Sequence, residues 1–212
     1  MKKSFLIIIL AALNLLSQAQ LLTVTPKIGL TLSTSREVAQ MDFIPAYLFG
    51  ASVAYKISPK FSLVSGVLFE QKREEFEFPL LDSNNYQTPG SETVMYNYLN
   101  IPLLMEYHPL RNHHIFINGG IYTGYLLNAK TKITSPYDSG IYNSPADLDI
   151  SNFNRVVFGV GIGGGITIPV AKNGQILIDL QYEHTLTQGT QFMDLQFKTL
   201  SISAGYAISI GK

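Results

Sequence analysis

The sequence predicts an all-β fold, an eight-stranded antiparallel up-and-down transmembrane β-barrel with long extracellular loops and short periplasmic turns. Three observations predict it. The stretch from Leu200 to Ile210 alternates apolar residues with small or hydroxylated ones without a break. Charged residues make up only 14% of the chain, against about 25% in ordinary soluble domains. Eight such alternating segments are joined by connections that are long and short in turn, which is the pattern of outer-membrane barrels.

The last segment shows why these stretches are strands. A helix has a period of 3.6 residues and would mix the two residue sets on every face, whereas a strand separates them. One face of the segment is wholly apolar and the other carries only Ser, Gly and Ala. This contrast suits lipid on one side and a polar interior on the other.

The first 19 residues are typical of a secretory signal peptide. Lys2 and Lys3 precede an apolar run from Phe5 to Leu16, and Ser17-Gln18-Ala19 then supplies small residues two apart. We therefore expect a signal peptide over 1–19 and one barrel domain over 20–212. Without Lys2 and Lys3 the acidic residues outnumber the basic ones by two, which predicts no nucleic-acid partner. The chain has no Cys and so no disulfide framework.

The remaining strands follow the same alternation. Polar or turn-forming residues separate them, and Asn173-Gly174 is a strong short hairpin signal. Pro102 interrupts the fourth strand, where we expect a bulge or an unpaired carbonyl because proline donates no ladder hydrogen bond. The predicted strands cover about 22–32, 47–57, 61–72, 95–108, 115–127, 158–168, 176–183 and 200–210. The predicted long connections are 33–42, 74–92, 130–152 and 185–194, and the short ones are 58–60, 109–112 and 171–174. For 74–92 the sequence leaves open a hairpin that extends above the membrane.

The run Tyr98-Leu99-Asn100-Ile101-Pro102-Leu103-Leu104, with Tyr107, resembles the signature of the PorT-like outer membrane protein beta-barrel domain family. Lys27-Ile28-Gly29, Phe116-Ile117-Asn118-Gly119-Gly120 and the glycine-rich sixth strand are also similar to that family. The resemblance runs from Leu21 to the end. It implies a small outer-membrane barrel, in some members attached to secretion or gliding machinery, and it implies no catalytic residues. The chain departs from many other outer-membrane barrels by ending in Lys212 instead of an aromatic residue.

Charged residues fall on the predicted lumen face. An eight-stranded barrel is just wide enough for its own side chains, and buried charges are costly unless paired. We therefore expect an interlocked network of salt bridges and hydrogen bonds. The alternative is a narrow ion or proton path, for which replacing Glu106 with Gln should alter conductance. The predicted lumen network consists of Lys27, Lys56, Glu70, Lys72, Glu106, Asp179 and Glu183.

Other motifs give only weak indications of a cofactor or metal site. Gly159-x-Gly161-x-x-Gly164 fits the dinucleotide fingerprint as text, but a strand continues where a helix is needed. We expect these glycines to leave room for bulky inward residues such as Tyr98 and Tyr122. Neighbouring strand residues point to opposite faces, so the pair His113-His114 is a poor metal chelate, and His108 and His184 stand at strand ends. The third long loop holds Asp138, Asp147 and Asp149, of which only the last two match the first two ligand positions of a calcium loop.

These observations predict an integral outer-membrane barrel with a structural, loop-display or envelope-complex role, no catalysis and no cofactor. The expected partners are outer-membrane lipid and proteins of the envelope or of a secretion complex. Two alternatives keep the same fold. One is a small passive channel, and the other is a lipid-modifying enzyme that would use Glu183-His184 with serines of the last strand. A soluble lipocalin-like barrel would require the apolar face to point inward.

Overall fold

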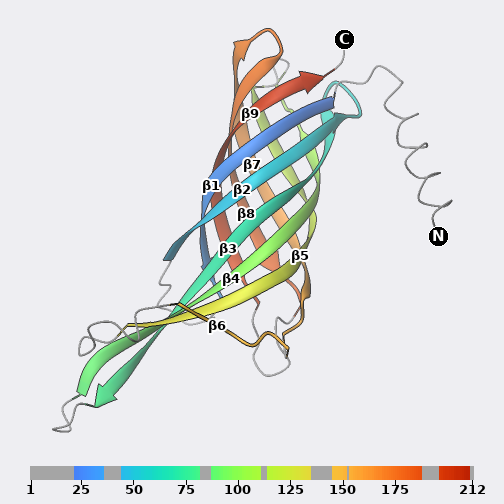
Figure 1. Cartoon of the computed structure of the whole chain (residues 1–212). Helices are drawn as coiled ribbons and strands as arrows, with labels where there is room; N and C mark the ends of the chain where they lie inside the picture. Colours follow the sequence, from blue (N-terminus) through green and yellow to red (C-terminus); the bar gives the residue numbers. More distant parts are fainter. Residues whose placement is uncertain are drawn as a thin grey trace.

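The computed structural model describes residues 22–35, 44–81, 87–110, 114–134, 145–151, 153–187 and 196–210. These residues form nine strands, of which eight are long and one, β6, has two residues (Figure 1). Among them no helix is long and apolar enough to cross a membrane. The expected signal peptide lies outside the described residues. The strands are β1 (Leu22–Thr34), β2 (Ile44–Lys56), β3 (Phe61–Leu81), β4 (Gln87–Tyr107), β5 (Ile115–Thr134), β6 (Ala146–Asp147), β7 (Val156–Ala171), β8 (Gly174–Thr185) and β9 (Lys198–Ile210).

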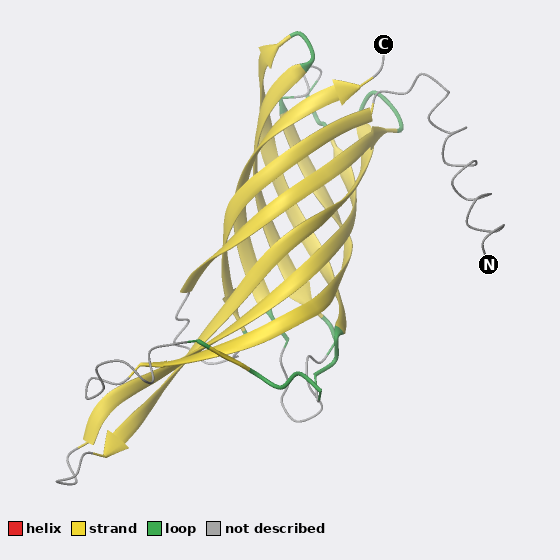
Figure 2. Ribbon diagram, viewed as in Figure 1, coloured by secondary structure: helices red, strands yellow, loops and turns green. Residues whose placement is uncertain are grey.

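The eight long strands close into a barrel, which confirms the predicted fold (Figure 2). They follow the order β4-β3-β2-β1-β9-β8-β7-β5, and β4 pairs with β5 to complete the ring. All pairs are antiparallel, and Leu22 of β1 faces Ile210 of β9. The first and last strands therefore meet at one rim, which also holds the short turns at 57–60 and 172–173. By the convention of outer-membrane barrels this rim is periplasmic.

The apolar face of every barrel strand points outward. Ile28 is 70% exposed and Ile162 is 66% exposed, whereas Thr31 and Ser203 are buried in the lumen. Because the alternation has a period of two, this assignment holds along each strand. The inverted, lipocalin-like arrangement is wrong for this chain.

Aromatic side chains lie at both ends of the outer surface. Phe61 and Tyr107, beside the periplasmic turn, have ring centroids 5.0 Å apart. Toward the loop end, Phe69 stacks on Phe49 at 5.0 Å and on Tyr47 at 5.9 Å. Two aromatic girdles of this kind mark the two interfaces of a membrane barrel.

Most of the predicted polar connection over 74–92 is strand, which decides in favour of the hairpin that the sequence left open. Beyond the last β2–β3 pair, Leu48 with Glu70, the β3–β4 ladder continues to Leu81 with Gln87. The resulting hairpin projects beyond the barrel (Figure 1). Glu75 and Glu77 alternate with Phe76 and Phe78, a period of two that their charge concealed. The predicted 130–152 loop is also too long, since β5 continues through Lys130 to Thr134.

Pro102 interrupts the β3–β4 ladder as expected. Pairing lapses between Ser65 with Leu103 and Leu68 with Asn100, although the register is the same on both sides. The bulge itself lies elsewhere, at Asn97 and Tyr98 on the β4–β5 side. Pro26 causes a similar lapse between β1 and β9. A closed barrel thus accommodates a missing backbone donor by leaving two residue pairs of one ladder unpaired.

The inward glycines of β7 lie beneath large side chains, as the sequence predicted. A Cβ at Gly159 would approach the Tyr122 ring to 2.5 Å, whereas one at the outward Gly119 would meet only a backbone oxygen at 3.5 Å. Gly159→Ala is therefore expected to lower the free energy of unfolding by about 2 kcal/mol through overpacking. Gly119→Ala, the matched control, should be neutral or slightly stabilising. Urea unfolding in lipid vesicles would measure both, and equal effects would contradict the steric explanation.

Candidate functional site: a layered lumen

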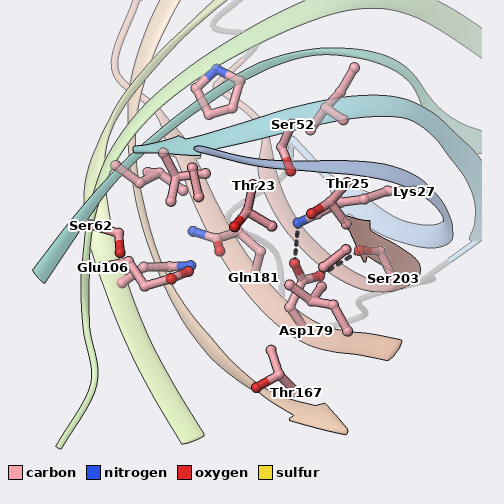
Figure 3. Close-up of a pocket in the computed structure, with 18 of the residues that line it drawn as sticks. Thr23, Thr25, Lys27, Ser52, Ser62, Glu106, Thr167, Asp179, Gln181 and Ser203 are labelled. Atoms are coloured by element: carbon pink, nitrogen blue, oxygen red, sulfur yellow. Dashed lines mark hydrogen bonds and ion pairs between the residues drawn. The ribbon is translucent and has the colours of Figure 1, made fainter. Parts of the chain in front are cut away.

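The periplasmic part of the lumen contains a cavity of about 210 Å³, the lumen cavity (Figure 3). Lys56 and Gln175, beside two periplasmic turns, place it at that end of the barrel. Leu104, Leu177 and other apolar residues complete its walls. Its hydroxyl groups come from Thr23, Thr25, Ser52, Ser62, Thr167, Ser201, Ser203 and Ser209. The cavity therefore combines hydroxyl and charged groups with apolar walls.

A charge pair crosses three neighbouring strands at the wall of this cavity. Lys27 of β1 forms an ion pair with Asp179 of β8, and Ser203 of β9 donates to the other carboxylate oxygen (Figure 3). Gly205 of β9 stands opposite Lys27 in the β1–β9 ladder, and a Cβ there would meet the Lys27 side chain at 3.1 Å. The absence of a side chain at 205 lets the lysine lie across β9 to its partner.

A second layer, the lumen plug, fills the barrel between the cavity and the loops. It consists of Glu70, Lys72, Tyr98, Tyr122 and Phe197. Lys72 Nζ lies 3.8 Å from Glu70 Oε2, and both side chains are only 2% exposed. The ammonium lies 5.5–5.8 Å from the centroids of the three aromatic rings, within the range of cation–π attraction.

Polar neighbours complete the plug. The Asn100 amide donates to Glu70, and the hydroxyls of Tyr122 and Thr185 are 2.7 Å apart. Glu183, which lines the cavity, also interacts electrostatically with Lys72. The plug therefore joins one ammonium to two carboxylates at the closed end of the cavity.

Above the plug, apolar side chains form the loop-end cluster. Its buried members are Val94, Tyr96, Tyr98, Leu126, Ala129, Val157 and Phe197, with Phe76, Leu148, Ile150 and Phe153 packed against them. The ring of Phe197 meets those of Tyr96 and Tyr98 edge-on, at 5.3 and 6.3 Å. In this cluster the β3–β4 hairpin, the segment after β6 and the residue before β9 pack together at the loop end of the barrel.

The structure brings the predicted lumen residues together in separate groups. Lys27 lies with Asp179, and Glu70, Lys72 and Glu183 lie together at the plug. Glu106 lies 3.0 Å from His108, a pairing that the sequence did not suggest. Lys56 lines the cavity but forms no ion pair within the described part of the chain. The network is thus layered instead of continuous.

Sequence reasoning missed Phe197 and the role of Asn100. Phe197 precedes β9 in a stretch without alternation, so no periodic signal assigns it to the lumen. The contact of Asn100 with Glu70 depends on the β3–β4 register, which sets Leu68 opposite Asn100. The contacts of Phe197 and Asn100 become visible only in the three-dimensional structure.

The other motifs bring no reactive group together among the described residues. Gly159, Gly161 and Gly164 lie within β7, a strand throughout. Across the β8–β9 ladder Glu183 faces Thr199 and His184 faces Lys198, so no serine stands opposite the predicted pair.

The candidate metal ligands are likewise dispersed. Within the described ranges no group of three His, Cys, Asp or Glu could hold a metal ion. His114 Nδ1 lies 3.1 Å from the Thr167 carbonyl oxygen, and His113 and Asp138 fall outside those ranges. Asp147 is 3.7 Å from Lys130. In the third loop, the backbone N–H and hydroxyl of Ser151 donate to Asp149 and hold the pKa of its carboxyl below the usual range.

The closed barrel, its apolar outer face and its charged lumen define a membrane-spanning β-barrel. The chain matches the outer membrane protein beta-barrel domain over residues 17–191 and belongs to that family. It is an outer-membrane protein.

Solved structures of other outer-membrane barrels match this chain over most of its length. Ail, the attachment invasion locus protein of Yersinia pestis, is 14% identical, with a TM-score of 0.47 over 90% of this chain and 100% of that one. Neisserial surface protein A is 12% identical, with a TM-score of 0.48 over 89% and 97%. OprG from Pseudomonas aeruginosa is 9% identical, with a TM-score of 0.44 over 92% and 97%. No curated protein matches the chain in sequence.

Proposed function

We propose that this protein is a non-catalytic membrane anchor that displays its β3–β4 hairpin to a protein partner in the cell envelope. The observation that carries the proposal is the length of the hairpin. β3 and β4 have 21 residues each, against 13 in β1, β2 and β9. A strand of about ten residues suffices to cross the membrane, so the additional length serves a role outside it.

The hairpin is built to hold its orientation. Phe76 packs against the loop-end cluster, and β5 accompanies β4 as far as the pair of Ser91 with Thr134. Glu75 and Glu77 are exposed on the projecting part. A rigid arm with an acidic face suits a partner with basic residues. The similarity to the PorT-like barrels, some of which attach to secretion or gliding machinery, supports a partner of this kind.

The proposal predicts that the hairpin is dispensable for folding but required for binding. Replacing residues 77–91 with Asn-Gly closes the hairpin on the pair of Phe76 with Glu92 by a favoured two-residue turn. The shortened protein should retain its folded gel mobility without boiling. A photo-crosslinking residue at Glu77 of the full chain should capture a discrete envelope protein, and the same residue at Lys172, in a periplasmic turn, should not capture it. The absence of a crosslink along the arm would contradict the display role.

A passive channel is the second candidate, favoured by the lumen cavity. Because the buried lumen plug lies between the cavity and the loops, we expect no discrete conductance in planar bilayers and no change on Glu106→Gln. Reproducible openings that change with Glu106→Gln would favour the channel instead. Comparison of lipid A by mass spectrometry, with and without the gene, would detect the lipid-modifying alternative.

A further inference from the structure

Three polar atoms at the inner end of the lumen cavity have no hydrogen-bond partner among the described residues. They are Asn118 Oδ1, Gln181 Nε2 and Glu183 Oε2, and each is inaccessible to bulk solvent. Asn118 is only 8% exposed, and all three residues line the cavity. Buried polar atoms are almost always hydrogen-bonded, so three together at one cavity wall point to an occupant.

The three groups converge over the glycine strip of β7. Asn118 of β5 and Gln181 of β8 both pair with Gly163, one from each side. A Cβ at Gly161 would lie 3.1 Å from Gln181 Nε2 and 3.6 Å from the Cγ of Glu183. Figure 3 shows Gln181 among the residues that project into the cavity. The missing side chains of β7 thus leave room beside two amides and a carboxylate.

The charges at the inner end of the cavity favour a cationic occupant. Lys56, the lining lysine without an ion pair among the described residues, lies at the opposite end, beside the periplasmic turn. Lys27 forms an ion pair with Asp179, and Lys72 lies within ion-pair distance of Glu70. Glu106 lies within ion-pair distance of His108. Glu183 interacts with Lys72 but forms no ion pair within the described residues. A buried carboxylate without its own counter-charge is unfavourable, and a bound cation would compensate it.

We propose that the inner end of the lumen cavity binds the ammonium group of a small organic cation that enters from the periplasmic side. Glu183 Oε2 and Asn118 Oδ1 accept two of its hydrogen bonds. Rotation of the Gln181 amide by half a turn, which exchanges its oxygen and nitrogen, supplies the third acceptor. A primary ammonium carries the three donors that this set requires.

The rest of the cavity limits the ligand. A volume of about 210 Å³ admits a chain of only a few carbon atoms, and Leu104 and Leu177 provide apolar contact for it. The described residues offer no group of three His, Cys, Asp or Glu that could hold a metal ion, and the single carboxylate of this set matches the single charge of an ammonium ion. The lumen plug closes the outer side, whereas Lys56 and Gln175 line the end beside the periplasmic turns.

The experiment titrates n-propylammonium into the ¹⁵N-labelled full barrel in lipid nanodiscs and follows the side-chain amide resonances of Asn118 and Gln181. Both should shift saturably, and 1-propanol, the neutral analogue, should not shift them. Glu183→Gln should weaken binding roughly tenfold or more, since it removes a charged hydrogen bond. Glu77→Gln, on the exposed hairpin, is the matched control and should leave binding unchanged.

Asn118→Leu, similar in size but without the acceptor, keeps the test valid if Glu183→Gln does not fold. It should also weaken propylammonium binding, which is then followed at Gln181 alone. An absent or unsaturable response would overturn the proposal. So would an equal response to 1-propanol, or undiminished binding in the folded variants. Each of these results would mean that the three atoms do not form an ammonium site.

Discussion

Replacing Lys72 with Met is expected to lower the free energy of unfolding by about 3–5 kcal/mol, the usual cost of removing one partner from a buried ion pair. Methionine retains the apolar stem but removes the ammonium. Glu70, 2% exposed, and Glu183 then lose the positive charge that they share. Urea unfolding of the barrel in phospholipid vesicles, followed by the gel shift between folded and unfolded forms, measures the effect.

Lys130→Met is the matched control. Lys130 lies 3.7 Å from Asp147, but the side chains are 43% and 81% exposed, and a pair of this kind contributes about 1 kcal/mol at most. Adding Glu70→Gln to Lys72→Met should recover part of the lost stability, because one uncompensated carboxylate is removed. Similar losses in the two lysine variants would show that burial of the charge is not what makes Lys72 important.

Asp179→Leu should have the second largest effect, a loss of about 3 kcal/mol. The substitution leaves the Lys27 ammonium and the Ser203 hydroxyl without their shared acceptor. Lys27 is 13% exposed at the wall of the lumen cavity, so water there should make the loss smaller than for Lys72. Urea unfolding under the same conditions would rank the two variants.

The double variant Lys27→Met with Asp179→Leu tests the cause. If the loss arises from the uncompensated ammonium, removing both charges should recover most of it, because an apolar pair needs no partner. A double variant as unstable as Asp179→Leu alone would instead indicate that the shape of the aspartate side chain matters. The two outcomes separate charge from packing.

The sequence predicted the barrel because its signal is local. In the Leu200 to Ile210 stretch the polarity of each residue indicates the face of the strand on which it lies. The structure places the apolar residues outward and the serines inward. The same alternation continued through Glu75, Phe76, Glu77 and Phe78, but there both faces lie outside the membrane, so a charged residue no longer marks the lumen. The sequence alone therefore does not decide between a loop and a hairpin there.

What the sequence by itself determined is the number of barrel strands, the lipid-facing and lumen-facing sets, and the residues that carry charge into the lumen. Only the tertiary structure decided which of them meet. Lys27 and Asp179 are 152 positions apart, and Phe197 reaches Lys72 from a segment without periodicity. Such contacts depend on how distant strands are paired and on how the barrel closes. A period of two shows only which residues point inward, so it does not determine which inward residues meet.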